Sequence, residues 1–311
     1  MWFDKLASFH VRPLPDDLGE LDLAISSFMD HLFFLGESQW TGRMVLYGTA
    51  FIKNLSFAHP ATMVCSKRAL RGWGKAAPEF SRGPLPWVGL AAICDWLVES
   101  RGSLGLQAAR ALALQGDGYF RPSELLNIQR SHVTTPLPRL GSRFKTYAIV
   151  VAPSQRDPQD VDGGLHRAAK SGHFDDTVLI GDKASLEAGR SWVLPLMRKL
   201  LKAASSPSDY LFPCLTLPVL ERLFSEATAA LGMQRLHATP HSVRHLGASE
   251  DSLAGLRTMG QIQGRGRWQA AASVARYSKH ARLLRQVAAL PNPVVERGAE
   301  VLGRATAVLH L

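Results

Sequence analysis

Apolar residues recur at helical spacing near the start of the chain. Between Leu18 and Leu35 they alternate in steps of three and four residues, and Gly36 follows as a stop signal. A second helical pattern covers residues 41–55 and ends in the broken sequence SFAHPAT. Together the two patterns predict a small helical domain over residues 1–72.

Residues 66–86 interrupt this pattern with a segment rich in glycine, proline and positive charge. Such a composition is typical of a linker, and we place a basic linker at residues 73–86. The segment is either a solvated loop or a strap that lies on a phosphate backbone, and we favour the strap. Its candidate phosphate-contacting residues are Lys67, Arg68, Arg71, Lys75 and Arg82.

The rest of the chain mixes helical patterns with a short β region. Residues 147–152 and 177–180 are apolar and β-branched, and the polar stretch between them is typical of a long hairpin loop. Helical patterns cover residues 87–98, 106–114, 186–204 and 217–231, and Pro122 stands at a favoured first helical position. The predicted fold class is therefore mostly α with a small antiparallel sheet (α+β), with a second domain over residues 87–290 and a C-terminal segment over 291–311.

Charge and composition narrow the classes of protein that fit. The 36 Lys and Arg outnumber the 26 Asp and Glu, for a formal net charge of +10, which favours a polyanionic partner such as nucleic acid. Charged residues interrupt every apolar run well short of the roughly 18 residues that a membrane span requires. The acidic N-terminal sequence is unlike a signal or transit peptide. We therefore expect a cytosolic or nuclear protein that is neither secreted nor held in a membrane.

The three cysteines are Cys65, Cys94 and Cys214, and none belongs to a CxxC pair. They indicate neither a disulfide framework nor a thiolate metal site. We interpret them as buried small apolar residues.

Arg121 and Glu124 form the first candidate motif, in the sequence GYFRPSELL. Three residues apart at the start of a helix, they share one face, so the carboxylate can orient the guanidinium. An arginine binds a phosphate through its planar fork and never loses its charge. On its own, the pair is more simply explained as an ordinary surface ion pair.

His241 and Arg244 show the same spacing just after Pro240, in the sequence TPHSVRH. This spacing places them in the first turn of a helix, near its positive end, where an anion is a natural occupant. His237, His241 and His245 are four residues apart, but Pro240 begins the helix and leaves His237 outside it. We therefore predict no metal site and interpret His245 as a hydrogen-bonded structural residue.

Tyr277 follows Trp268 by nine residues in a segment that carries several positive charges. A tyrosine nucleophile requires such charges and a proton acceptor, because the ordinary pKa of its phenol is about 10. The local charges are Arg276, Lys279, His280 and Arg282. Lys170, between the two candidate strands, could swing toward a bound backbone. Alone, Tyr277 is typical of a half-buried aromatic residue and Lys170 of a solvated loop residue.

Taken in order along the chain, these motifs resemble the catalytic signature of the tyrosine recombinase, or phage integrase, family of DNA strand-exchange enzymes. The resemblance rests on R-x-x-E, a hairpin lysine, H-x-x-R-H, and a tryptophan followed nine residues later by a tyrosine, and it covers residues 84–285. The SGHFDDT stretch after Lys170, and Trp268 where many members have histidine, are more like recombinases of eukaryotic mobile elements. Pro122 and the lead-in GQIQGRGRW, in place of the common LLGH, depart from the family pattern and concern loop conformation more than chemistry.

The resemblance implies a covalent mechanism. Tyr277 would attack the scissile phosphate and form a 3′-phosphotyrosyl link, while Arg121 and Arg244 bind the non-bridging oxygens. Lys170 would protonate the departing 5′ oxygen, and His241 would accept or position the phenol proton. The covalent link stores the bond energy, so neither metal, ATP nor any other cofactor is implied.

Two further residues support this set. Trp268 would pack against the phosphate pocket and could donate its indole N–H. Glu124 would brace Arg121 from behind. The implied catalytic residues are thus Arg121, Lys170, His241, Arg244, Trp268 and Tyr277.

The same resemblance implies a two-domain, C-shaped clamp on double-stranded DNA, with a helical core-binding domain before the catalytic domain. The implied function is site-specific recombination or integration of a mobile element by a homo-oligomer, a tetramer when synapsed, in a eukaryotic nucleus or otherwise in the cytoplasm or nucleoid. A type IB topoisomerase or telomere resolvase would share the pocket. A domesticated recombinase would recognise DNA without turnover.

The family often docks its last helix onto the next protomer. The positions after Pro293 form a stripe of small apolar residues, namely Val294, Gly298, Val301, Ala305 and Val308. We predict that this stripe contacts another protomer on DNA, the alternative being that it packs on its own domain.

Overall fold

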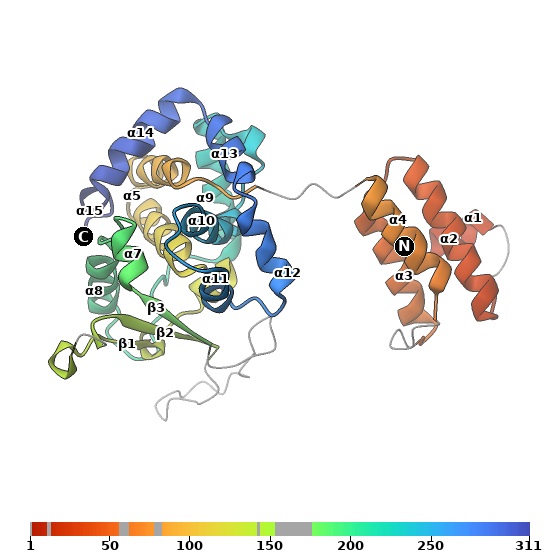
Figure 1. Ribbon diagram of the computed structural model, residues 1–311, viewed down its shortest axis with the longest axis horizontal. Helices are drawn as coiled ribbons and strands as arrows, with labels where there is room; N and C mark the ends of the chain where they lie inside the picture. The colour runs from red at the N-terminus through yellow and green to blue at the C-terminus, as the bar shows by residue number, and fades with distance from the viewer. Residues whose placement is uncertain (1, 11–13, 56–61, 78–82, 142–143, 153–175) are drawn as a thin grey trace. The chain divides into compact units, whose positions relative to one another are not determined.

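The computed structural model describes residues 2–10, 14–55, 62–77, 83–141, 144–152 and 176–311. The chain divides into two compact units, residues 1–81 and 82–311. The described part of the first unit is helical, and the second unit combines helices with a small sheet (Figure 1).

The first unit contains α1 (Trp2–His10), α2 (Leu18–Phe34), α3 (Gln39–Ile52) and α4 (Val64–Ala76). The Asp17 side chain caps α2 by accepting a hydrogen bond from the Glu20 backbone N–H. Residues Leu21, Ile25, Phe28 and Leu32 of α2 are buried in the core of the unit. The two helices predicted from the apolar spacing are therefore confirmed.

Helix α4 corrects the start of the predicted linker, because it runs to residue 76 and contains four of the five basic residues assigned to the strap. The first turn of α4 is capped by a residue of another helix. The Asp22 carboxylate of α2 accepts hydrogen bonds from the backbone N–H groups of Cys65 (2.7 Å) and Ser66 (2.8 Å). Trp73 of α4 is buried against α3, where Gly42 leaves room for its ring. A cap supplied from another helix leaves no local sequence signal.

The basic residues of α4 differ in exposure. Arg68, Arg71 and Lys75 are exposed, and Lys67 is half-buried. Arg82 lies outside the described residues.

The second unit begins with α5 (Trp87–Gly118), which joins the two helices predicted over 87–98 and 106–114 across a break at Gly102. Gly102 has a φ of 53°, a left-handed value that glycine adopts without strain. The other helices are α6 (Pro122–Leu126), α7 (Lys183–Glu187), α8 (Val193–Ala203), α9 (Leu217–Ala230), α10 (Pro240–Leu253), α11 (Met259–Gly266), α12 (Ala271–Val274), α13 (Ala281–Ala288), α14 (Asn292–Gly303) and α15 (Ala305–Val308). Short 3₁₀ turns are η1 (Arg130–His132), η2 (Pro138–Leu140), η4 (Gln234–Leu236) and η5 (Ala275–Ser278).

The sheet contains β1 (Val133–Thr134), β2 (Tyr147–Val151) and β3 (Asp176–Ile180) in the order β1-β2-β3, and both pairings are antiparallel. In β2 every second side chain is buried, as a sheet with one face on a core requires. The two predicted strands are confirmed, whereas β1 is too short to carry a pattern. Most of the loop between β2 and β3, including Lys170, lies outside the described residues.

Helices α5 and α10 approach each other closely at two glycines. A Cβ on Gly247 of α10 would lie only 2.1 Å from the carbonyl oxygen of Gly116 in α5. The end of α5 therefore runs directly beside α10. This contact brings Arg121, which follows α5, next to the His241–Arg244 motif.

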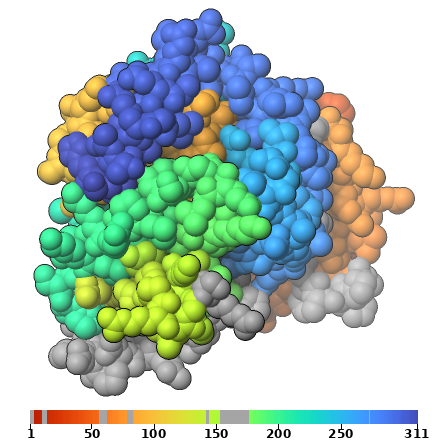
Figure 2. Space-filling view, turned by 60° about the vertical axis from the view of Figure 1, so that its left-hand side comes forward, coloured from red at the N-terminus to blue at the C-terminus, as the bar shows by residue number. Residues whose placement is uncertain are grey.

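The C-terminal stripe packs on its own unit, as in the alternative given above, and the contact with another protomer stays a prediction. Val294, Gly298 and Val301 of α14 are buried, and α14 packs along α5. A Cβ on Gly298 would lie 2.0 Å from the Val88 carbonyl oxygen, so the helices touch through their backbones. Figure 2 shows the C-terminal helices, in dark blue, lying against the part of the unit that contains α7, in green.

Two predictions from composition have mixed outcomes. The described cysteines are not paired: Cys94 is buried and Cys65 half-buried, but Cys214 is exposed, so its predicted burial is wrong.

Among the helices that the structure describes, none is long and apolar enough to cross a membrane.

Candidate active site

Glu124 lies at the centre of a cluster of arginines, the Glu124 cluster. Its carboxylate binds the Nη1 atom of Arg121, the Nη1 atom of Arg244 at 3.3 Å and the Nη2 atom of Arg267 at 2.6 Å. It also accepts a hydrogen bond from the Arg121 backbone N–H at 2.9 Å, which holds the start of α6. The side chains of Glu124 and Arg244 are only 7% and 1% exposed. The Arg121–Glu124 pair is therefore not an ordinary surface ion pair.

The Glu124 cluster has an excess of positive charge. Three guanidinium groups share one carboxylate, so the cluster carries a net charge of about +2. The pKa of Arg244 is lowered to about 9, chiefly by burial and further by the neighbouring Arg121 and Arg267, while Glu124 offsets part of the fall. Burial works to raise the pKa of Glu124, but Arg267, Arg244 and Arg121 outweigh it and hold that pKa below its usual value. A buried excess of this kind favours the binding of an anion.

Arg267 is a site residue that the sequence reasoning missed. It follows α11 with a φ of 55°, a left-handed value uncommon for a residue with a side chain. Its guanidinium donates to the Arg265 carbonyl oxygen at 2.9 Å as well as to Glu124. The available signal was the basic lead-in GQIQGRGRW, which stands in place of the common LLGH.

Trp268 joins the Glu124 cluster to Tyr277. The Arg244 guanidinium carbon lies 4.9 Å from the centre of the Trp268 ring, and the Trp268 and Tyr277 ring centres are also 4.9 Å apart. Arg244 also donates to the carbonyl oxygen of Gly266. A side chain at Gly266 would overlap the Trp268 ring, so glycine is required for this close packing.

Tyr277 is buried, with 3% of its surface exposed, and its hydroxyl contacts His245. The Tyr277 Oη atom lies 2.6 Å from the His245 Nδ1 atom. Burial raises the pKa of the Tyr277 phenol well above its ordinary value, although Arg276, Arg244 and Arg282 offset part of the rise. His241 lies on the other side of His245, with its ring edge-on and the ring centres 5.0 Å apart.

The basic residues after Tyr277 line a small pocket beside its phenol. The pocket is lined by Pro84, His245, Ser249, Arg276, Tyr277, Lys279, His280, Arg282 and Leu283. Burial, together with the nearby His241, Arg276, Arg244 and Arg282, lowers the pKa of His245 to about 3. The imidazole of His245 is therefore neutral at physiological pH.

The described candidates thus form one connected set. Contacts run from Arg121 through Glu124 and Arg244 to Trp268, Tyr277, His245 and His241. Lys170 lies outside the described residues, and the candidate phosphate-contacting residues of α4 belong to the other unit. His245 is hydrogen-bonded, as predicted, but its partner is the candidate nucleophile itself.

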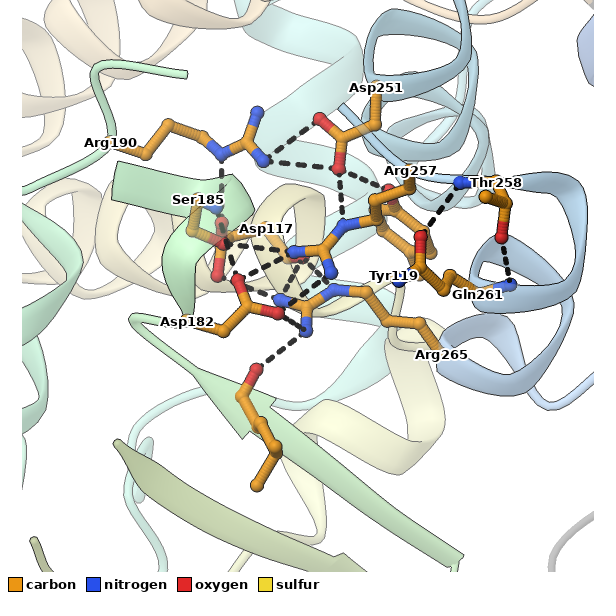
Figure 3. Close-up of polar contacts among 11 residues, drawn as sticks. Asp117, Tyr119, Asp182, Ser185, Arg190, Asp251, Arg257, Thr258, Gln261 and Arg265 are labelled. Atoms are coloured by element: carbon orange, nitrogen blue, oxygen red, sulfur yellow. Dashed lines mark hydrogen bonds and ion pairs between the residues drawn. The ribbon is translucent and has the colours of Figure 1, made fainter. Parts of the chain in front are cut away.

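A second arginine cluster, the Asp251 network, lies in the same unit (Figure 3). It pairs three arginines with three aspartates, namely Arg190, Arg257, Arg265, Asp117, Asp182 and Asp251. Asp251 of α10 binds Arg190 at 2.9 Å and Arg257 at 2.8 Å, and it accepts a hydrogen bond from the Tyr119 hydroxyl at 2.5 Å. These charges balance, in contrast to those of the Glu124 cluster.

The Asp251 network fixes the segments that carry the site. Asp117 and Tyr119 come from the end of α5, just before Arg121, and Asp251 is two turns along α10 from Arg244. Arg265 of α11 binds the Asp117 carboxylate and donates to the Leu179 carbonyl oxygen of β3 at 2.6 Å. Helices α5, α10 and α11 and the sheet are thereby held together at one place.

Asp251→Asn tests the importance of this network for stability. The substitution keeps the shape but leaves Arg190 and Arg257 buried with less counter-charge, so we expect the free energy of unfolding to fall by about 3–5 kcal/mol. Chemical denaturation of the full chain, followed by circular dichroism, measures the change. The matched control is Glu226→Gln, which breaks an exposed pair with Arg101 and Arg222 and should change little. Equal, small effects of both variants would contradict the assigned role.

The depressed pKa of His245 predicts that acid destabilises the second unit. Between the unfolded pKa of about 6.5 and the folded value of about 3, the unfolded chain binds the proton and the folded chain does not. The free energy of unfolding should therefore fall as the pH drops from about 6.5 to about 3. His245 alone contributes up to about 1.4 kcal/mol of this loss per pH unit. Denaturation at a series of pH values should show a shallower slope for His245→Asn, whereas His310→Gln, at an exposed position, should keep the slope of the unaltered chain. An unchanged slope in His245→Asn would refute the assignment.

Among the described residues, no three His, Cys, Asp or Glu side chains gather in a way that could hold a metal ion. No protein-family model matches the chain, and no curated protein is similar to it in sequence.

Two solved structures are similar to the chain. The XerH site-specific recombinase bound to palindromic difH substrate, a post-cleavage complex, matches with a TM-score of 0.52 and 12% identity, over 89% of this chain and 71% of that chain. The XerH recombinase bound to difH substrate in a pre-cleavage complex matches with a TM-score of 0.43 and 14% identity, over 84% of this chain and 74% of that chain. The first likeness confirms the predicted fold class, and this chain shares the fold of the XerH site-specific recombinase.

Proposed function

We propose that the protein breaks and rejoins DNA through a covalent link between Tyr277 and a 3′ phosphate. The observation that carries the proposal is the buried excess of positive charge around Glu124, joined to the Tyr277 phenol through Trp268. A phosphodiester supplies the missing negative charge. The fold that the chain shares with the XerH recombinase supports the same conclusion.

Arg121 and Arg244 bind the non-bridging oxygens of the scissile phosphate. Hydrogen bonds between a guanidinium and a phosphate are charge-assisted, and the fork of arginine can make two in parallel. Attack on phosphorus adds negative charge to these oxygens, so the arginines stabilise the transition state more than the ground state. Because Glu124 already holds the guanidinium groups in place, little reorganisation is needed at that moment.

The bond changes follow from this arrangement. The Tyr277 oxygen attacks phosphorus, the bond to the 5′ oxygen breaks, and Lys170 protonates that oxygen. The phosphotyrosyl link keeps the energy of the broken bond, so a 5′ hydroxyl of the same or another strand can reverse the step without ATP. Trp268 covers the phosphate and limits access of water.

The first unit supplies contacts to the DNA backbone. Arg68, Arg71 and Lys75 follow each other at steps of three and four residues, which places them along one face of α4, and all three are exposed. Lys and Arg that neutralise phosphates release condensed counterions, which gives affinity without sequence selectivity. The formal net charge of +10 agrees with double-stranded DNA as the partner.

Covalent capture tests the proposal without knowledge of the target site. The full chain is incubated with a library of duplexes of randomised sequence, each nicked near the centre so that a short cleaved fragment diffuses away and traps the adduct. We expect adducts that survive denaturation, with the DNA attached to Tyr277 in the peptide map. Tyr277→Phe should form none, because phenylalanine has no oxygen to attack phosphorus.

The matched control is Tyr210→Phe, at an exposed tyrosine of the same unit, which should form adducts normally. Enrichment of one DNA sequence without any adduct would contradict cleavage and indicate a binding protein without turnover. The captured sequence is then placed in a supercoiled plasmid: products that are only relaxed circles would indicate a topoisomerase, and only sealed hairpins a telomere resolvase, instead of a recombinase.

A further inference from the structure

We propose that His245, one helical turn after His241, accepts the phenol proton of Tyr277 during DNA cleavage. The inference rests on the proposed function and assigns to His245 the role that the family resemblance gives to His241. The His245 Nδ1 atom lies 2.6 Å from the Tyr277 Oη atom, within the range of direct proton transfer. With its own proton on Nε2, a neutral imidazole presents the Nδ1 lone pair to the phenol.

The environment of Tyr277 makes a proton acceptor necessary. The phenol is buried, and burial raises its pKa well above the ordinary value, so the phenolate is scarcely present at neutral pH. The O–H bond must therefore break while the bond to phosphorus forms. General base catalysis of this kind contributes about 10²- to 10⁴-fold to a rate.

The groups around His245 keep it neutral until substrate binds. Besides burial, the positive charges that face it come from three elements, with His241 and Arg244 on α10, Arg276 on η5 and Arg282 on α13. A phosphate bound near Arg244 opposes these charges and so raises the proton affinity of the imidazole. His245 thus becomes a stronger base only when a DNA phosphate is in place.

His241 has a different position. The ring of His241 meets the ring of His245 edge-on, with the ring centres 5.0 Å apart. His241 itself is exposed at the surface of α10. From there it acts on His245 through its charge and packing, as a positioning residue.

The step balances as a proton transfer coupled to transesterification. The Tyr277 oxygen forms a bond to phosphorus, and its proton passes to His245 Nδ1. The bond from phosphorus to the 5′ oxygen breaks, and its electron pair stays on that oxygen, which takes a proton from the proposed acid Lys170. In the rejoining step, His245 returns the proton to the departing phenolate.

His245→Asn separates this role from a structural one. The asparagine side chain places a polar atom close to the position of Nδ1 and can keep the hydrogen bond to Tyr277, but it cannot take up a proton. With a nicked duplex recovered from the capture library, we expect the rate of adduct formation to fall about 10²- to 10⁴-fold while DNA affinity is unchanged. The rate of the variant should rise about tenfold per pH unit, because the phenol must ionise by itself.

A more acidic phenol should restore the lost rate. Incorporation of a fluorinated tyrosine at position 277 lowers the phenol pKa, so it should recover much of the activity of His245→Asn. The matched variant His241→Asn should keep the pH profile of the unaltered protein. The inference is overturned if His245→Asn cleaves normally, if it is slow with an unchanged pH profile and no recovery, or if His241→Asn shows the altered profile instead.

A measurement on the unaltered protein covers the case in which His245→Asn fails to fold. Adduct formation in heavy water should be slower than in ordinary water, because the proton moves during the attack, and equal rates would overturn the inference. If the unaltered protein forms no adduct on any duplex, the proposed function fails, and that result is distinct from every outcome above.

Discussion

One carboxylate, that of Glu124, sets the geometry of the site. It draws together arginines from three separate parts of the chain: Arg121 before α6, Arg244 within α10 and Arg267 after α11. A single negative charge cannot neutralise three guanidinium groups, so the cluster keeps an excess of positive charge. The Asp251 network joins the same helices with three arginines and three aspartates in balance. The two clusters thus differ in charge: the Asp251 network is neutral, whereas the Glu124 cluster, to which the proposed function assigns the phosphate, keeps an excess of positive charge.

The site residues were accessible from sequence where their signals are local. The spacing of Arg121 and Glu124, the proline before His241, and the nine-residue step from Trp268 to Tyr277 can each be read from a few neighbouring positions. The Asp251 network could not be predicted, because its six members are spread over residues 117–265. Taken alone, each is a charged residue that no local sequence pattern marks as part of a network. The role of Arg267 is hidden for the same reason, since only the fold brings it to Glu124.

For the fold, too, the elements set by local sequence patterns were predicted, whereas those set by contacts between distant residues were not. The apolar periods predicted α2, α3, β2 and β3, whose burial follows one face of each element. The composition of residues 66–86 predicted a linker where part of α4 forms. The carboxylate that caps the start of α4 comes from Asp22 of another helix, so it leaves no local signal in the sequence. The C-terminal stripe was recognised as apolar, but its spacing could not distinguish α5 of the same unit from a second protomer as its partner. The backbone contact at Gly298 shows that α14 packs on α5 of the same unit.

We infer that Arg121 and Arg244 hold a phosphate that Tyr277 attacks. The phenol itself is buried, with its hydroxyl against His245. The decisive experiment is a crystal structure of the full chain with orthovanadate and DNA strands that end at the scissile position. We predict vanadium bonded to the Tyr277 oxygen, with its equatorial oxygens on Arg121 and Arg244 and the imidazole of His245 beside the phenol. Vanadate bound away from the Glu124 cluster, with Tyr277 still buried on His245, would contradict the account.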